Sequence, residues 1–187
     1  MTNQAPDIFR NVHKGIRHAL ASACTALGRA GSEAEAERAR ATLQEALRFV
    51  KHHGENEDLL LLPLLSERVP AVAASMGEAH HALEAQIAAL SRDALGGEAL
   101  YLAACAFTAD YLRHMDDEET RHEPSIRAAL SVEELQRFSQ QSVQRTAPAD
   151  QRMMLGYMLP AMTRADVEAF LGRLPPALAA ELRSLRD

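Results

Sequence analysis

The sequence predicts an all-α protein, an up-down-up-down four-helix bundle followed by a C-terminal helical appendage. Ala, Leu, Glu and Arg dominate the composition, and all four are strong helix formers. β-branched residues are sparse and no long stretch alternates apolar and polar residues, so no strand is expected. Four long helical segments with short connections favour the bundle.

Caps, glycines and prolines divide the chain into its predicted helices. The second helix begins at Ser32, because Ser32 and Glu35 read as a capping box, and Pro63 and Pro70 bracket its end. A turn at Gly96-Gly97 precedes the fourth helix, which Pro124 disturbs. The four predicted helices cover about residues 6–28, 32 to the 63–70 bracket, 71–92 and 98–124.

Two regions follow from this division. Residues 1–130 are predicted to form the bundle, and residues 131–187 a helical C-terminal extension that starts with a capped helix at Ser131. Acidic and basic side chains are equal in number in the extension, so the negative charge of the chain belongs to the bundle.

Charge and cysteine content exclude several classes of protein. The net charge of −6 is a poor basis for binding nucleic acid or anionic lipid, so neither is expected as a partner. Cys24 and Cys105 form no CxxC pattern and predict neither a disulfide framework nor a thiolate metal site. The start of the chain lacks a signal-peptide pattern, and the most apolar stretch, residues 59–65, is too short to span a bilayer. A reducing, cytoplasmic location is expected.

Histidine interrupts the apolar stripe of every predicted bundle helix. Counted from the connecting turns, the four imidazoles lie near one level of an antiparallel bundle. Glu57 and Glu118 each follow one of them by four residues and therefore share its helix face. The four histidines, one from each helix in order, are His13, His53, His80 and His114.

The same spacing occurs twice in the chain. Residues 53–63 and 114–124 both read His-x3-Glu-x5-Pro, and the single histidines of the first and third helices also correspond. Each helical hairpin thus supplies the same three ligands. Two half-sites that face each other predict a dinuclear metal centre, with two histidines for each metal and with Glu57 and Glu118 as bridges.

Metal binding would remove the cost of burying six ionisable side chains. Imidazole and carboxylate ligands without thiolate suit iron, manganese or zinc. Two bridging carboxylates with four histidines favour two iron ions, with manganese and zinc as alternatives.

These motifs resemble the hemerythrin-like family of HHE cation-binding domains over about residues 9–130. The resemblance implies a four-helix bundle with a di-iron site built from a His, an HxxxE, a second His and a second HxxxE. The matching segments are residues 12–16, residues 53–58 with Pro63, residues 78–83, and residues 114–119 with Pro124.

One departure from the family pattern bears on function. Oxygen carriers of the family place a further histidine one turn after the third-helix ligand, where this chain has Glu84. Four histidines with two glutamates look more like the family's iron-sensing domains and its nitric-oxide-linked, iron-centre repair proteins. The resemblance therefore implies binding of O2, NO or peroxide for sensing, scavenging or iron handling, and it leaves open whether the protein is an enzyme.

Three side chains are candidates for accessory roles. Glu84 could bind metal, but an ion pair across the bundle between Glu84 and Arg17 is expected first, because Arg17 occupies the equivalent place in the first helix. Tyr111 could donate a hydrogen bond near the metals, although a packing role is favoured. His122 is a candidate accessory ligand or gate. His18, His52 and His81 are expected on solvated helix faces, with His81 as the substitute ligand if the register is shifted by one residue.

Two other interpretations remain open. A ferritin-like oxidase would use ExxH motifs, which occur at residues 78–81 and 119–122, but residues 7–30 hold no Glu for the first helix to contribute. The protein could also be an interaction module, in which the metal only stabilises the bundle. Its extension, with Met153, Met154, Tyr157 and Met158 close together, would dock a partner or a second copy in a homodimer.

Overall fold

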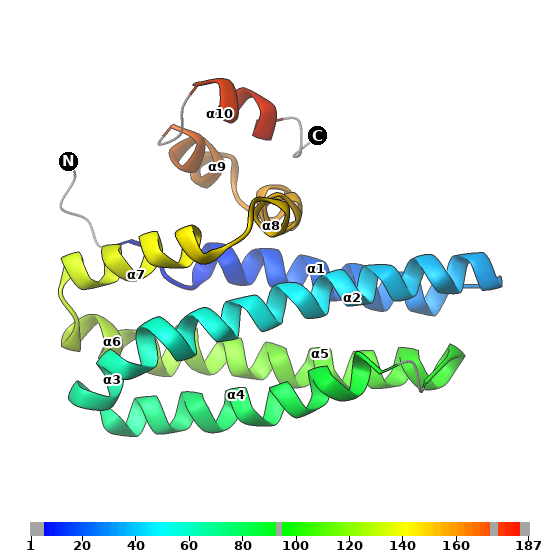
Figure 1. Cartoon of the computed structure of the whole chain (residues 1–187), viewed down its shortest axis with the longest axis horizontal. Helices are drawn as coiled ribbons and strands as arrows, with labels where there is room; N and C mark the ends of the chain where they lie inside the picture. Colours follow the sequence, from blue (N-terminus) through cyan, green and yellow to red (C-terminus); the bar gives the residue numbers. More distant parts are fainter. Residues whose placement is uncertain (1–5, 93–94, 173–175, 184–187) are drawn as a thin grey trace.

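The computed structural model describes residues 6–92, 95–172 and 176–183. These ranges are helical throughout except for short connections and hold no strand, so the predicted all-α class is confirmed (Figure 1). The remaining residues of the two predicted regions lie outside the described part of the chain. Among the described residues no helix combines the length and the apolar character needed to cross a membrane.

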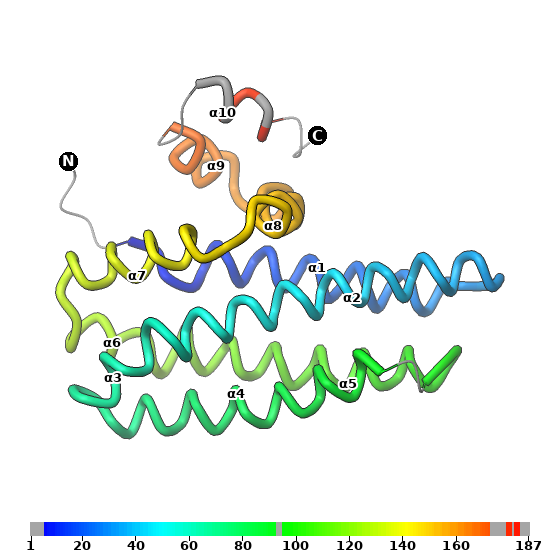
Figure 2. The backbone as a smooth tube through the Cα atoms, in the orientation of Figure 1, coloured from blue at the N-terminus to red at the C-terminus, as the bar shows by residue number. Residues whose placement is uncertain are grey.

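Four long helices lie side by side and correspond to the four predicted ones (Figure 2). Ser32 begins the second of them, since its hydroxyl accepts a hydrogen bond from the backbone N–H of Glu35. The Glu35 carboxylate accepts hydrogen bonds from the Gly31 N–H and the Ser32 hydroxyl. The long helices are α1 (Arg10–Arg29), α2 (Glu33–Asn56), α4 (Pro70–Leu90) and α5 (Gly97–Asp117).

Two of these helices continue through a π-helical turn. The turn η1 (Glu57–Leu61) joins α2 to α3 (Leu62–Arg68), and η2 (Glu118–His122) joins α5 to α6 (Glu123–Ala129). In each turn the first N–H of the following helix donates to the glutamate carbonyl five residues earlier. A proline in an α-helix lacks a donor and clashes with the carbonyl four residues before it. The wider turn accommodates the proline near the start of α3 and α6, so neither helical path stops there.

The apolar core consists of two clusters along the bundle. The larger cluster lies among the four long helices and includes Phe49 and Phe107. The second lies among residues of α3, α4, α6 and α7 together with Phe9, and includes Leu65 and Ile126. Each fully buried Leu or Phe contributes roughly 1.5–3 kcal/mol, so the two clusters fix the helices on both sides of the histidine layer.

The C-terminal extension packs against the bundle through α7 and α8. Leu135 and Phe138 of α7 join the second cluster. A Cβ on Gly15 of α1 would lie 2.5 Å from Met158 Cγ and 3.1 Å from Met158 Cα, so α1 and α8 approach closely. A third cluster joins α8, α9 and α10. The extension helices are α7 (Val132–Arg145), α8 (Pro148–Ala161), α9 (Arg164–Leu171) and α10 (Pro176–Arg183).

Two histidines expected in solvent instead contact this extension. The Nδ1 of His18 lies 3.0 Å from the Tyr157 carbonyl, and the Nε2 of His52 lies 2.7 Å from the Thr146 hydroxyl. The solvated placement was wrong for both, because the extension covers the faces that a bundle alone would expose. His81 is exposed, as predicted.

Candidate metal centre

Six side chains from four helices meet at one level of the bundle. Each histidine comes from one long helix, while the two glutamates are the first residues of η1 and η2. All six are buried. Two groups of four offer ligand atoms that lie within 4.8 Å of one another, and the two groups share both glutamates. The groups are His13, His53, Glu57 and Glu118, and Glu57, His80, His114 and Glu118.

The first group surrounds a point between α1 and α2. The Nε2 atoms of His13 and His53 are 3.0 Å apart. Oε1 of Glu57 lies 3.3 Å from the nitrogen of His53, and Oε2 of Glu118 lies 3.3 Å from that of His13. Ligand atoms about 2.1 Å from a shared transition-metal ion lie roughly 3.0–3.5 Å from each other, so this spacing fits one cation.

The second group repeats this arrangement between α4 and α5. Nε2 of His114 lies 3.3 Å from Oε1 of Glu118, and Nε2 of His80 lies 3.5 Å from Oε2 of Glu57. Each glutamate thus turns one oxygen to the histidines of one hairpin and its other oxygen to those of the other hairpin. This is the arrangement of a carboxylate that bridges two cations.

Apart from the Nε2 atoms of His13 and His53, which face each other, the candidate ligand atoms lack hydrogen-bond partners in the protein. Both carboxylate oxygens of Glu57 and Glu118, and the Nε2 atoms of His80 and His114, are buried without one. Buried carboxylate oxygens without donors are expensive, and native proteins satisfy them with protein, water or ions. The residues present therefore fit a metal centre, and their nitrogen and oxygen donors suit iron, manganese or zinc.

Two carboxylates that the sequence motifs contain, but to which no role was assigned, support the histidines from outside. Asp58 Oδ1 lies 2.6 Å from Nδ1 of His80, and Glu119 Oε1 lies 2.8 Å from Nδ1 of His13. Each is the residue after a central glutamate and reaches the histidine of the other hairpin. The signal in the sequence was the acidic residue that follows the glutamate in both copies of the repeat.

The expected ion pair between Glu84 and Arg17 is wrong. The guanidinium of Arg17 donates to both carboxylate oxygens of Glu119, at 2.8 and 3.1 Å. Glu84 is exposed on α4 and lines a pocket beside α2. The repeat places both residues one turn after a histidine, but it does not give the direction of their helix faces.

Burial and mutual charge shift the pKa values of the central groups. Burial alone would lower the pKa of His80, but contacts with Glu118 and Glu57 raise it to about 11. His13 is likewise buried, and Glu118 and Glu119 raise its pKa to about 9. Burial and the charge of Glu118 raise the pKa of Glu57 to about 7. Without cations, protons on imidazole compensate the carboxylates, so metal binding must displace protons.

Tyr111 and His122 lie beside the six side chains. The Tyr111 hydroxyl donates to the Val50 carbonyl at 3.4 Å, and its ring stacks edge-on against His114 with centroids 5.5 Å apart. These contacts are compatible with the packing role that the sequence favoured for Tyr111, which stays a prediction. His122 ends η2 outside both ligand groups, and its Nδ1 is buried without a hydrogen-bond partner.

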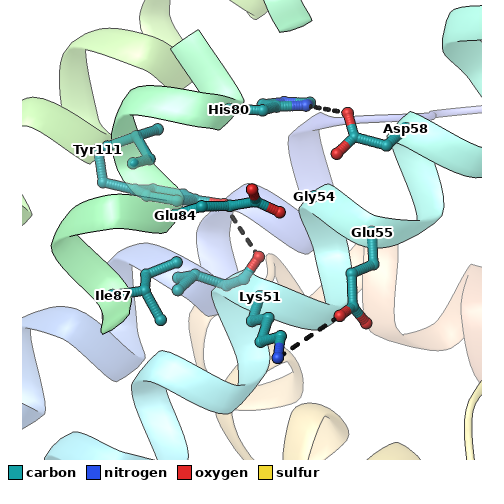
Figure 3. Close-up of a pocket in the computed structure, with 10 residues that line it drawn as sticks. Lys51, Gly54, Glu55, Asp58, His80, Glu84, Ile87 and Tyr111 are labelled. Carbon is teal, nitrogen blue, oxygen red and sulfur yellow. Dashed lines mark hydrogen bonds and ion pairs between the residues drawn. The ribbon is translucent and has the colours of Figure 1, made fainter. Parts of the chain in front are cut away.

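A pocket between α2 and α4 is lined by His80, one of the six converging side chains (Figure 3). His80 and Asp58 lie at one end of it, and an ion pair of 3.7 Å between Lys51 and Glu55 lies on the exposed side. A Cβ on Gly54 would meet nothing within 4 Å, so the space beside α2 is open. The pocket is lined by Val50, Lys51, Gly54, Glu55, Asp58, His80, Leu83, Glu84, Ile87 and Tyr111.

Comparison with known proteins agrees with this geometry. The family model described as the hemerythrin HHE cation binding domain matches residues 4–125. No curated protein and no solved structure matches the chain significantly. The matched stretch covers more than half of the chain and contains all six converging side chains. The chain therefore belongs to the hemerythrin HHE cation-binding domain family.

Proposed function

We propose that this protein holds two iron ions in its buried centre and binds O2, NO or peroxide there. The proposal rests mainly on the carboxylates of Glu57 and Glu118. Their four carboxylate oxygens are buried without donors and face the histidines of both hairpins. Two bridging carboxylates with four imidazoles are a donor set that favours iron, and manganese and zinc are the alternatives.

Each hairpin would hold one ion. His13 and His53 would ligate the first, and His80 and His114 the second, while both glutamates bridge. Asp58 and Glu119 would accept the Nδ1 protons of His80 and His13, which keeps each Nε2 lone pair free for the metal. When bound, iron supplies an open coordination position for a diatomic ligand and electrons to exchange with it.

The surrounding side chains would control access to the centre. Val50, Leu83 and Ile87 give the pocket an apolar wall that disfavours bulk water, and Gly54 leaves room for a small molecule. A ligand of two or three atoms would enter between α2 and α4 and meet the centre at His80. Glu84 lines the same pocket, and we propose that it controls entry or serves as an accessory ligand.

The architecture proposed for this function is an up-down-up-down bundle formed by residues 1–130, with residues 131–187 as an extension that covers α1 and η1. The packing of α8 on Gly15 and of α7 on the second cluster supports it. Two free thiols favour a reducing, cytoplasmic location. Sensing, scavenging and iron handling all fit such a centre.

Metal analysis of the purified protein, combined with visible absorption spectra, tests the proposal. We expect two iron ions per chain and a spectrum that changes on reduction and again on addition of O2 or NO. Two tightly bound zinc ions and a spectrum without redox response would refute the iron assignment and favour a metal that only staples the bundle.

A further inference from the structure

Cys24 of α1 and Cys105 of α5 face each other across the helix interface. Both are free and half-buried. The Cys24 thiol lies 3.3 Å from the hydroxyl of Thr108, which is three residues from Cys105 on α5, and the neighbouring Cys105 thiol adds to the raised pKa of Cys24. Cys105 likewise raises the pKa of the Tyr101 hydroxyl. Two thiols that are remote in the sequence therefore form one cluster.

The helix register places the two cysteines opposite each other. One turn away, a Cβ on Gly28 of α1 would stand 3.1 Å from the Tyr101 ring of α5. In an antiparallel pair, four residues back from Gly28 and four residues forward from Tyr101 lead to the same level, where Cys24 and Cys105 lie. The close approach at Gly28 brings the two backbones near enough for their side chains to meet.

We propose that Cys24 and Cys105 are a modification site, where a hydroperoxide converts the two thiols into a reversible intramolecular disulfide. With hydrogen peroxide as the oxidant, the thiolate of one cysteine attacks a peroxide oxygen, the O–O bond breaks and a sulfenic acid forms, and the hydroxide released takes up the proton that the thiol lost and becomes water. The other thiolate then attacks the sulfenic sulfur, the S–S bond forms, and hydroxide leaves with a proton as a second water. Two thiols are thereby oxidised and one peroxide is reduced.

The site is separate from the metal centre. Cys24 follows His13 by eleven residues on α1, which corresponds to about 16 Å along the helix axis. Burial raises the pKa of the Cys24 thiol, and the hydrogen bond with Thr108 offsets only part of this rise. A raised pKa keeps Cys24 mostly in the thiol form, so we expect its oxidation to be slow at neutral pH.

Intact mass and thiol counting on the full-length protein test the proposal. The purified protein is treated with hydrogen peroxide and, in parallel, with diamide. Diamide oxidises pairs of thiols to disulfides and needs no metal to do so. We expect both thiols to disappear together, with a mass loss of about 2 Da that dithiothreitol reverses. Cys24→Ser and Cys105→Ser variants should lack this loss, and peroxide should leave on each a single sulfenic acid that dimedone traps.

Other products would overturn the inference. Stepwise gain of oxygen atoms on each cysteine would show that the thiols react independently. A disulfide-linked dimer would show that the pair cannot close within one chain. Because diamide needs no metal, a disulfide formed by diamide in protein without iron would support this inference even if the proposed metal function fails.

Discussion

The carboxylate of Asp58 lies 2.6 Å from the Nδ1 atom of His80, although the two residues belong to different helical hairpins. Glu119 holds His13 in the same way from the opposite direction. The hairpins are thus tied crosswise, each one orienting a histidine of the other. Such partners fix the tautomer of a ligating imidazole and raise its basicity.

The crosswise contacts predict a loss of metal affinity when either carboxylate is removed. Asp58→Asn and Glu119→Gln should each weaken metal binding roughly 10- to 100-fold, because the amide no longer favours a proton on Nδ1. Competition with a chelator of known affinity measures this. Glu55→Gln, which alters an exposed carboxylate of the same pocket, is the control, and equal affinities for all three variants would contradict the supporting role.

Removal of the two carboxylates that we propose as bridges should prevent the binding of two metal ions. In the double variant Glu57→Gln with Glu118→Gln, each amide offers one neutral oxygen in place of two anionic ones, so fewer than two metal ions per chain are expected. Helicity, measured by circular dichroism, should remain largely intact. Retention of two ions in elemental analysis would reject the bridging roles.

A Glu84→Gln variant is the matched comparison for the double variant of Glu57 and Glu118. Its carboxylate is exposed and lies one turn beyond His80. If it only lines the pocket, Glu84→Gln should keep both metal ions and change the rate at which NO or O2 binds, measured by stopped-flow absorption. A lower metal content in this variant would instead identify Glu84 as a ligand.

Chelation should destabilise the protein. Cations present at 1,000 times their Kd stabilise the folded state by about 4 kcal/mol. For a chain of this size that corresponds to a fall in Tm of roughly 10 °C when the metal is removed. Thermal unfolding before and after exhaustive chelation measures it, and readdition of metal should restore the original Tm. An unchanged Tm would speak against a buried metal pair.

The contact between α1 and α8 predicts opposite effects of the same substitution at two glycines. Gly15→Ala places its methyl group 3.1 Å from the Met158 backbone, which must shift, so we expect a loss of about 1–3 kcal/mol in the free energy of unfolding. Gly156→Ala on α8 meets nothing within 4 Å and should stabilise the helix by up to about 1 kcal/mol. Urea unfolding compares them, and equal stabilities would show that the extension does not press on α1.

Acid should remove the stabilisation from the pair formed by Glu134 and Arg68. Hydrogen bonds from Arg68 and from the Ser131 backbone N–H lower the pKa of Glu134 to about 2. A folded pKa below the unfolded value near 4.3 means that the contribution is complete above about pH 4.3 and is lost as the pH falls towards 2. The stability difference between the wild type and Glu134→Gln should therefore shrink over that interval, and a constant difference would contradict the assignment.

The sequence allowed the helices and the convergence of six side chains to be predicted, because both depend on periodicity and on distance along the chain. The level of His13, for example, follows from its separation from the turn before Ser32 and from the rise of an α-helix. The ligation itself stays a prediction until metal is measured.

Features that depend on rotation about a helix axis escaped prediction. Pro63 and Pro124 indicated that the helices end or are disturbed there. In the structure a π turn just before each proline lets the helical path continue. Arg17 pairs with Glu119 because η2 presents that residue to α1, and no count of residues gives this direction. The contacts of His18 and His52 could not be predicted, because they depend on where the C-terminal extension packs. The sequence of the extension indicates short helices but not their positions on the bundle.

The two π turns have a consequence for the register between the histidine layer and the end of the bundle. Each turn takes in one residue more than an α-helical turn, so the helix beyond it keeps its face toward the bundle despite the extra residue. If the same residues ran on as a continuous α-helix, everything beyond the turn would be rotated by about 100°, and Leu65 and Ile126 would point away from the second apolar cluster. The π turns therefore let one stretch of chain supply both a glutamate of the centre and an apolar side chain that closes the end of the bundle.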